Sequence, residues 1–141
     1  MAGFVNLVKL CVGTDRVEDL IDWQQGQSWP GGHPVHVTRM WPKRGHELLA
    51  GGSLYWVFKG VILARQRLVA LEEVQGSDGI RRCALVLDAE VIRTAGAPRR
   101  PFQGWRYLDP ADAPRDLAPG RKFETALPDQ LARALADIGL R

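Results

Sequence analysis

Short apolar runs, separated by glycine, proline and aspartate, recur along this chain and predict a series of strands with few helices. The first run, Phe4–Val12, predicts a buried strand that ends at Gly13. Apolar residues at helical spacing then predict a short helix over Val17–Gln25, with acidic residues in its first turn. We expect Thr14 or Asp15 to cap this helix through a side-chain oxygen.

The middle of the chain predicts a β-rich core. A strand over Val35–Met40 ends at Pro42, and one or two helical turns follow before Gly51-Gly52. Three longer apolar runs come next, joined by turn signals at Lys59-Gly60 and at Gln75–Gly79: Leu54–Lys59, Val61–Leu71 and Ile80–Leu87. This hairpin spacing predicts three consecutive antiparallel strands in one curved sheet.

The remaining segments predict an irregular end with one helix. The glycine, proline and arginine residues of Ala95–Pro101 predict a loop. A short strand is expected over Phe102–Leu108, and a helix at about 127–138. Short strands with hairpin spacing and a few short helices fit a single α+β domain over residues 1–141, built as a small mixed β-barrel with peripheral helices. A four-stranded α+β sandwich is the alternative.

Length and composition fit an ordinary soluble domain. The chain has 141 residues, of which 45% are hydrophobic and 25% charged, and no apolar run is long enough to cross a bilayer. The N-terminus lacks the pattern of a signal peptide, so we expect a cytoplasmic protein without a membrane partner. Cys11 and Cys83 lie in apolar surroundings, which favours buried reduced thiols over a disulfide.

Positive charge is concentrated in the middle of the chain. Between Arg39 and Arg67 there are six Lys or Arg residues against one acid, Glu47, which gives this window a charge of +5 although the whole chain carries only +3. The same window contains Trp41 within the motif RMWPKR. Cations beside aromatic rings suit the phosphates and stacked bases of a nucleic acid.

No pattern of residues predicts catalysis, a metal or a cofactor. His33, His36, His46 and Cys11 lack the spacing of a metal site, and the chain has no nucleophile motif and no phosphate-binding loop. Whether the protein is an enzyme is left open.

The chain is rich in tryptophan, with five residues. We expect Trp56, inside the run YWVFK, and Trp23, near the end of a helix, to be core residues. Trp29, Trp41 and Trp105 lie in or beside loops next to cations, where each is either a packing residue or part of a binding site.

Two segments resemble a known family. NLVKLCVGTDRVEDL is similar to the opening strand, loop and short helix of EVE domains, and VHVTRMWPKRGHEL followed by GGSLYWVFKGVILARQRLVAL is similar to that family's next section. The resemblance covers roughly Phe4–Leu108. The RMWPKR, GGSLYWV-KG and RPFQGWRYL blocks also resemble a family of uncharacterised bacterial proteins.

The EVE resemblance implies membership of the PUA-like group, to which ASCH domains also belong. This group is built on a small pseudo-barrel that binds RNA or modified bases. The implied pocket lies between the end of the first strand and the aromatic segment, and its residues would be Lys9, Thr38, Arg39, Trp41 and Arg44. Charge and aromaticity add Trp105 and Arg106 to this pocket, while Arg65 and Arg67 would supply the surrounding positive field.

We therefore expect a non-catalytic module that binds RNA or a modified base in DNA, with Trp41 stacking on an exposed base. One alternative is an ASCH-like amidohydrolase acting on a small nucleoside-like amide, which requires Lys9, Thr14 or Thr38, and Glu72 to converge. The other alternative is a protein-interaction module anchored by exposed aromatic rings. The ligand and the oligomeric state do not follow from the sequence.

Overall fold

The computed structural model describes residues 3–100 and 102–117. The expected helix at about 127–138 therefore lies outside the described residues. Seven strands and two α-helices follow in the order β1 (Asn6–Leu10), α1 (Val17–Gln25), β2 (Val35–Thr38), α2 (Gly45–Leu49), β3 (Ser53–Phe58), β4 (Val61–Gln75), β5 (Arg81–Leu87), β6 (Ile92–Pro98) and β7 (Trp105–Leu108). Two short 3-10 turns, η1 (Pro30–Gly32) and η2 (Pro110–Asp112), complete the described part.

All seven strands belong to one mixed sheet, in which the order is β2-β5-β4-β3-β1-β7 and β6 pairs with β4. The β1–β3 pair is parallel, and the other ladders are antiparallel. A sheet of this size with two helices agrees with the α+β class. Within the described residues β2 and β7 stand at the two ends of the order, and no ladder joins them.

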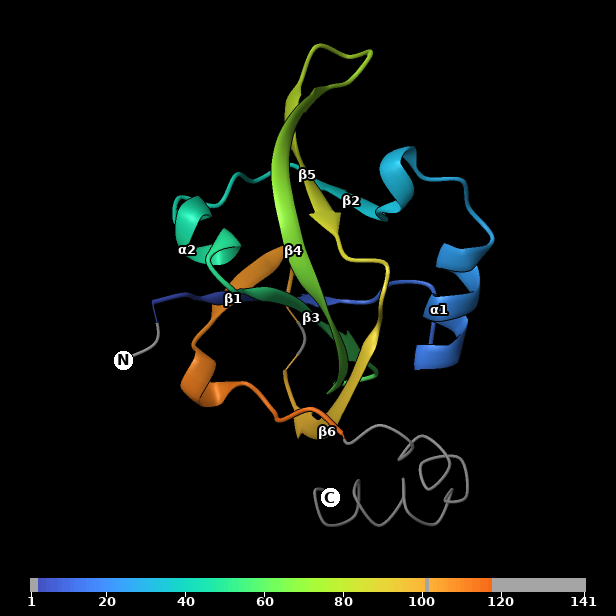
Figure 1. Cartoon of the computed structure of the whole chain (residues 1–141), viewed down its shortest axis with the longest axis vertical. Helices are drawn as coiled ribbons and strands as arrows, with labels where there is room; N and C mark the ends of the chain where they lie inside the picture. The colour runs from blue at the N-terminus through green and yellow to red at the C-terminus, as the bar shows by residue number, and fades with distance from the viewer. Residues whose placement is uncertain (1–2, 101, 118–141) are drawn as a thin grey trace.

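The three long apolar runs form β3, β4 and β5, which are consecutive and antiparallel, as the sequence predicts. Lys59 (φ 48°) and Gly60 (φ 83°) make the turn between β3 and β4, where both central residues need positive φ. One edge of β4 pairs with β3, while the other pairs first with β6 and then with β5. Figure 1 shows β4 as a long curved strand whose turn to β5 projects beyond the other elements.

Side chains pack on both faces of this sheet. On the helix-covered face, α1 contributes Val17 and Leu20, and α2 contributes Leu48, to the main core around Leu54 and Trp56. A smaller cluster packs on the opposite face: Val8, Tyr55, Val57, Ile62 and Leu108. Burial of apolar surface on both faces is the main stabilising contribution expected for this sheet.

Three predictions about local structure are wrong. Ala95–Pro98 is not a loop but part of β6, because β4 pairs with one edge of it and the backbone of Arg115 hydrogen-bonds to Ala95 on the other. A proline is tolerated there because Pro98 is the last residue of the strand. Neither Thr14 nor Asp15 caps α1, because the N-cap residue is Arg16 and its side chain makes no capping hydrogen bond. The Thr14 hydroxyl is instead hydrogen-bonded to the Cys11 thiol at 2.8 Å.

Trp23 is also not a core residue, because 54% of it is exposed. The face of α1 that meets the sheet carries Val17, Leu20 and Gln24, and Trp23 lies outside that stripe. Instead, the Trp23 ring packs edge-on against Trp29, with 5.8 Å between the ring centroids.

Cys11 and Cys83 are free thiols, as the sequence predicts. Burial raises the pKa of both thiols, and that of Cys83 reaches about 11. Neither is therefore an activated nucleophile at neutral pH. No helix among residues 3–100 and 102–117 combines the length and the apolarity needed to cross a bilayer.

Candidate nucleic-acid interface

The register of β1 separates the predicted site residues into two groups. Lys9 lies opposite Trp56 of β3 and Trp105 of β7, so these three side chains share the helix-covered face. Val8 lies opposite Tyr55 and Arg106, which places Arg106 on the opposite face. Because neighbours along a strand alternate between faces, the predicted residues do not form one cleft.

The segment 39–44, which follows β2, is held by two aromatic residues of β7. The indole N–H of Trp105 donates to the carbonyl of Met40 at 3.0 Å. The hydroxyl of Tyr107 accepts hydrogen bonds from the backbone N–H groups of Lys43 (2.8 Å) and Arg44 (3.1 Å). Trp105, which is 4% exposed, is therefore a packing and anchoring residue, and the segment has a fixed position beside the sheet.

A guanidinium group lies over each of two aromatic rings in this region. Arg81 lies 4.8 Å from the ring centroid of Trp41, and Arg44 lies 5.3 Å from that of Tyr107. Each arginine also forms an ion pair with an exposed carboxylate: Arg81 pairs with Glu73, and Arg44 pairs with Glu47. Such surface ion pairs contribute little energy, so these side chains can exchange one anionic partner for another.

Trp41 is half-buried and packs against the main core, so part of this ring has a packing role. Its indole N–H is buried and has no hydrogen-bond partner in the described part of the chain. An unpartnered buried donor costs free energy, and native proteins rarely keep one without a reason. One face of the ring is covered by Arg81, which lies where a stacked base would lie.

Lys9 and His36 form a polar pair inside the helix-covered face. Burial lowers the pKa of Lys9, and the nearby Cys11 thiol partly offsets that effect. Burial also lowers the pKa of His36 to about 4, with a further contribution from the charge of Lys9. The His36 ring packs edge-on against Trp56 at 5.4 Å, and its Nε2 atom has no partner among the described residues.

The remaining residues of this group differ in exposure. Thr38, the last residue of β2, is half-buried and lies opposite Cys83 of β5. Arg39 is exposed at the start of segment 39–44. The inner side of this region is therefore lined by Lys9, Thr38 and Trp41. Its surface carries Arg39 and Arg44.

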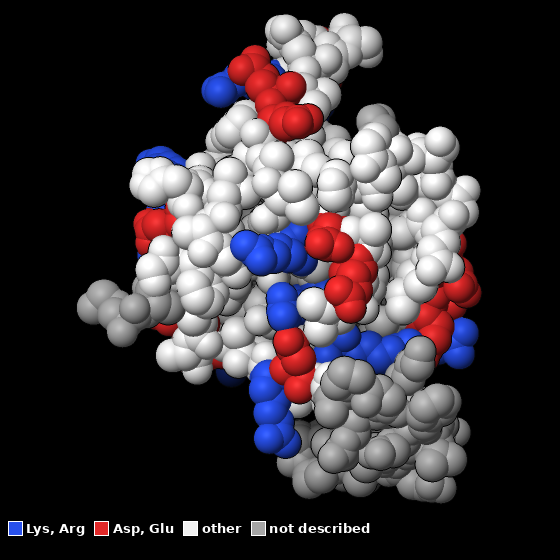
Figure 2. Space-filling model, in the orientation of Figure 1, with Lys and Arg blue, Asp and Glu red and all other residues white. Residues whose placement is uncertain are grey.

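The second group lies on the opposite face of the sheet, where an acidic side chain neutralises Arg65. Arg65 binds Asp116 through two hydrogen bonds of 2.7–2.8 Å and also donates to Ser53. This ion pair lines an open pocket of about 270 Å³ with Tyr55 and Arg115. In Figure 2, basic and acidic side chains lie next to one another in the centre and lower part of a mostly uncharged face, and they do not form one positive surface.

Arg67 and Arg106 are the exposed members of this second group. Arg67 lies opposite Ser53 in the β3–β4 ladder. Arg106 donates to the carbonyls of Gln103 and Trp105 and lies 5.3 Å from the ring centroid of Phe102. Both side chains lie on the face opposite segment 39–44, although Arg106 is flanked on β7 by Trp105 and Tyr107, which bind that segment.

The structure does not unite the residues required for an amidohydrolase. Glu72 is exposed on the distal half of β4, opposite Ala84 of β5, whereas Lys9 lies between β3 and β7. No carboxylate of the described residues shifts the pKa of Lys9. Within residues 3–100 and 102–117 there is also no cluster of three or more His, Cys, Asp or Glu side chains able to hold a metal ion.

Sequence reasoning missed three residues of this region: His36, Arg81 and Tyr107. His36 alternates with Val37 on β2, and it is Val37 that is exposed. Arg81 lies on β5, far from Trp41 in the sequence, and the register between β2 and β5 brings the two side chains together. Tyr107 follows Trp105 by two residues on β7 and shares its face, but no local pattern indicates that its hydroxyl anchors segment 39–44.

Comparison of the sequence with curated proteins and with solved structures finds no match. One family model matches residues 7–141, which is nearly the whole chain. The match includes both groups of site residues and the described strands. The chain therefore belongs to the family described as "Protein of unknown function (DUF1489)".

Proposed function

We propose that this protein binds single-stranded nucleic acid, either RNA or DNA with an exposed modified base, without catalysing a reaction. The binding surface would be the rim, which we define by six residues: Arg39, Trp41, Lys43, Arg44, Arg81 and Tyr107. It combines two aromatic rings with four cations on one anchored segment and the adjoining strands.

The observation that carries this proposal is the position of Arg81 over the Trp41 ring, 4.8 Å from its centroid. A base that stacks on Trp41 would take the place of this guanidinium, and Arg81 would then contact the adjacent phosphate. Stacking of a base on one aromatic ring contributes about 1–3 kcal/mol. Since 58% of the Arg81 side chain is exposed, the movement requires little repacking.

The unsatisfied polar atoms beneath the rim support base recognition. The indole N–H of Trp41 is a donor, and the Nε2 atom of His36 can donate or accept. The N–H of Trp41 lies in the plane of its ring, so its acceptor would be a carbonyl oxygen or ring nitrogen of the nucleotide next to the stacked base. The half-buried ammonium group of Lys9 adds a further donor close to His36.

We also propose that the fold is the PUA-like pseudo-barrel, in which segment 39–44 bridges the two ends of the sheet order. The hydrogen bonds from Trp105 to Met40 and from Lys43 to Tyr107 support this, because they join the segment after β2 to β7. We infer a cytoplasmic location, which agrees with the free thiols of Cys11 and Cys83.

Removal of two rim cations should weaken strand binding. We expect the double variant Arg39→Ala/Lys43→Ala to bind a fluorescein-labelled single-stranded RNA roughly tenfold more weakly near physiological salt. For single strands, each lost phosphate contact should also reduce the magnitude of the slope of log K against log salt by about 0.7. Fluorescence anisotropy at several salt concentrations measures both quantities.

A matched control removes two exposed arginines from the opposite face, Arg67→Ala/Arg106→Ala. This variant loses the same net charge, so a purely non-specific attraction would weaken equally in both. We expect the control to keep most of the wild-type affinity and salt dependence. If the two double variants weaken binding to the same extent, the rim is not the binding surface.

A further inference from the structure

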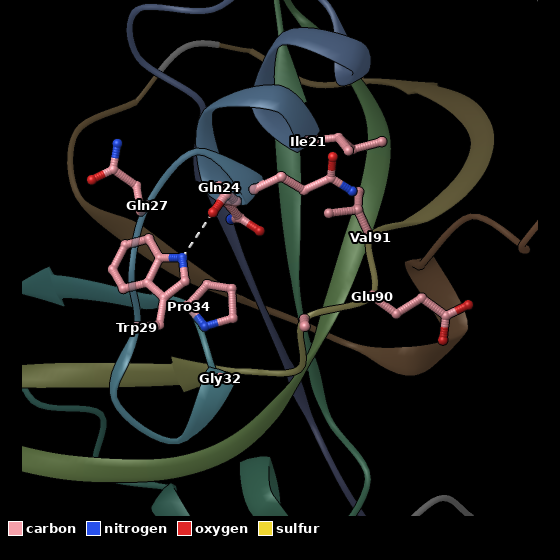
Figure 3. A pocket seen from close by; sticks show the side chains of 10 residues that line it. Ile21, Gln24, Gln27, Trp29, Gly32, Pro34, Glu90 and Val91 are labelled. Carbon is pink, nitrogen blue, oxygen red and sulfur yellow. Dashed lines mark hydrogen bonds between the residues drawn. The ribbon is translucent and has the colours of Figure 1, made fainter.

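An open pocket of about 470 Å³ lies away from the rim, beside the C-terminal end of α1. Its walls come from α1, the loop around η1 and the connection between β5 and β6, as Figure 3 shows. This volume is within the usual range for small-molecule sites, about 300–1,000 Å³. No residue of the rim lines it.

One wall of the pocket carries the ring of Trp29. Its indole N–H donates to the carbonyl of Gln24 at 2.9 Å, which fixes the ring, and Trp23 packs against it edge-on. In Figure 3 the ring of Pro34 lies next to Trp29, and Ile21 and Val91 lie on the far side of the pocket. These side chains provide apolar walls that suit a flat molecule.

Gln24 provides a fixed polar group in another wall. Its buried carboxamide forms a reciprocal pair with Gln66, with hydrogen bonds of 3.0 and 2.8 Å. Gln66 is in turn held by the indole of Trp56 and by the carbonyl of Asp88. The pair with Gln66 uses the edge of the Gln24 carboxamide on which the N–H and the oxygen lie side by side, so one N–H and one lone pair remain, and these point in different directions.

The charge of the lining disfavours a phosphate. Gln25 and Gln27 add two further neutral carboxamides, and no Lys or Arg of the described residues lines the pocket. Among those residues Glu90 is the one ionisable group of the lining, and in Figure 3 its carboxylate points away from Trp29 toward the outer edge of the pocket. An anionic group would be repelled at this edge, whereas an uncharged ligand would not.

We propose that this pocket binds an uncharged nucleobase, as a nucleoside or as a base unstacked from a strand. The base would lie along Trp29, and its donor and acceptor atoms would bind the other carboxamides that line the pocket, those of Gln25 and Gln27. The inference does not depend on strand binding, because the pocket and the rim share no residue.

The test is titration of the whole protein with uridine, cytidine, adenosine and guanosine, followed by ¹H–¹⁵N NMR. When added at concentrations below about 10 mM, which detect even weak binding, at least one nucleoside should shift the indole N–H resonance of Trp29. Its 5′-monophosphate should bind more weakly. Absence of a shift with all four nucleosides, or an equal response to ribose alone, would overturn the proposal.

Two variants make the test specific to the pocket. Trp29→Ala should weaken binding of the responding nucleoside roughly tenfold or more, since it removes the stacking surface. Because this variant has no Trp29 indole, the titration is followed through the side-chain amide resonances of Gln24 and Gln25. Glu90→Gln alters only an exposed carboxylate, and it should narrow the difference in affinity between the nucleoside and its monophosphate. If Trp29→Ala binds like the wild type, or Glu90→Gln leaves that difference unchanged, the pocket is not the nucleobase site.

Addition of a single-stranded RNA to the same samples distinguishes between a base that belongs to a strand and a free nucleoside. RNA-induced shifts of the side-chain amide resonances of Gln24 and Gln25, lost in Trp29→Ala while anisotropy still reports strand binding, would indicate an unstacked base of the strand. Shifts with nucleoside alone would indicate a free ligand. Failure of the rim to bind RNA would leave the nucleoside result intact, so the two proposals fail separately.

Discussion

Replacement of Trp56 by alanine should lower the free energy of unfolding by about 3–5 kcal/mol, the usual effect of removing a large buried aromatic ring. Trp56 is 4% exposed and packs in the main core, where it also contacts His36. Its indole N–H donates to Gln66 at 2.9 Å, so the substitution also removes a partner from a buried carboxamide. Urea denaturation, with an unchanged m-value, measures the effect.

Trp23→Ala is the matched control for this substitution. The same side chain is lost, but Trp23 is 54% exposed on α1 and lies outside the core. We expect a change of less than about 1 kcal/mol, since surface substitutions rarely have large effects. Equal destabilisation by the two substitutions would contradict the assignment of Trp56 to the core and of Trp23 to the surface.

Stability should fall as the pH is lowered from about 6.5 toward 4, because of His36. Its pKa is about 4 in the folded protein and about 6.5 in an unfolded chain, so the unfolded state binds a proton first. The stabilisation is thus complete above pH 6.5 and is lost as the pH falls through this window. A shift of this size corresponds to at most about 3 kcal/mol.

The measurement is urea denaturation at several pH values, compared with His36→Gln. The variant should show a flatter profile between pH 6.5 and 4. His46→Gln is the control, because His46 is exposed on α2, and it should keep the wild-type profile. Carboxylates with lowered pKa values, such as Asp116 and Asp78, contribute to acid sensitivity mainly at lower pH. A wild-type profile in His36→Gln would show that His36 is not the responsible group.

Local patterns in the sequence were sufficient to predict most of the strands. The range Val17–Gln25 for α1, the turn at Lys59-Gly60 and the antiparallel order of β3, β4 and β5 are confirmed. These features depend on helical spacing and on turn chemistry, which neighbouring residues determine. β6 was missed because Gly96 and Pro98 resemble a loop, and its pairing with β4 is a long-range contact.

The site was less predictable, because it depends on register and on distant partners. Lys9 and Arg106 were expected in one cleft, but the β1–β7 ladder places them on opposite faces. Arg65 was expected to supply free positive charge, but Asp116, far along the chain, binds it. The Gln24–Gln66 pair links α1 to β4 in the same way, and no local pattern marks either glutamine.

The central claim is that the rim binds single-stranded nucleic acid, and anisotropy of the wild-type protein with labelled RNA and DNA oligonucleotides tests it most directly. At about 50 mM salt, phosphate contacts are strong, so binding should be easily detected. With up to four rim cations engaged, log K should fall with log salt at a slope of about −2 to −3. No detectable binding of either oligonucleotide at about 50 mM salt, or an affinity independent of salt, would contradict the claim.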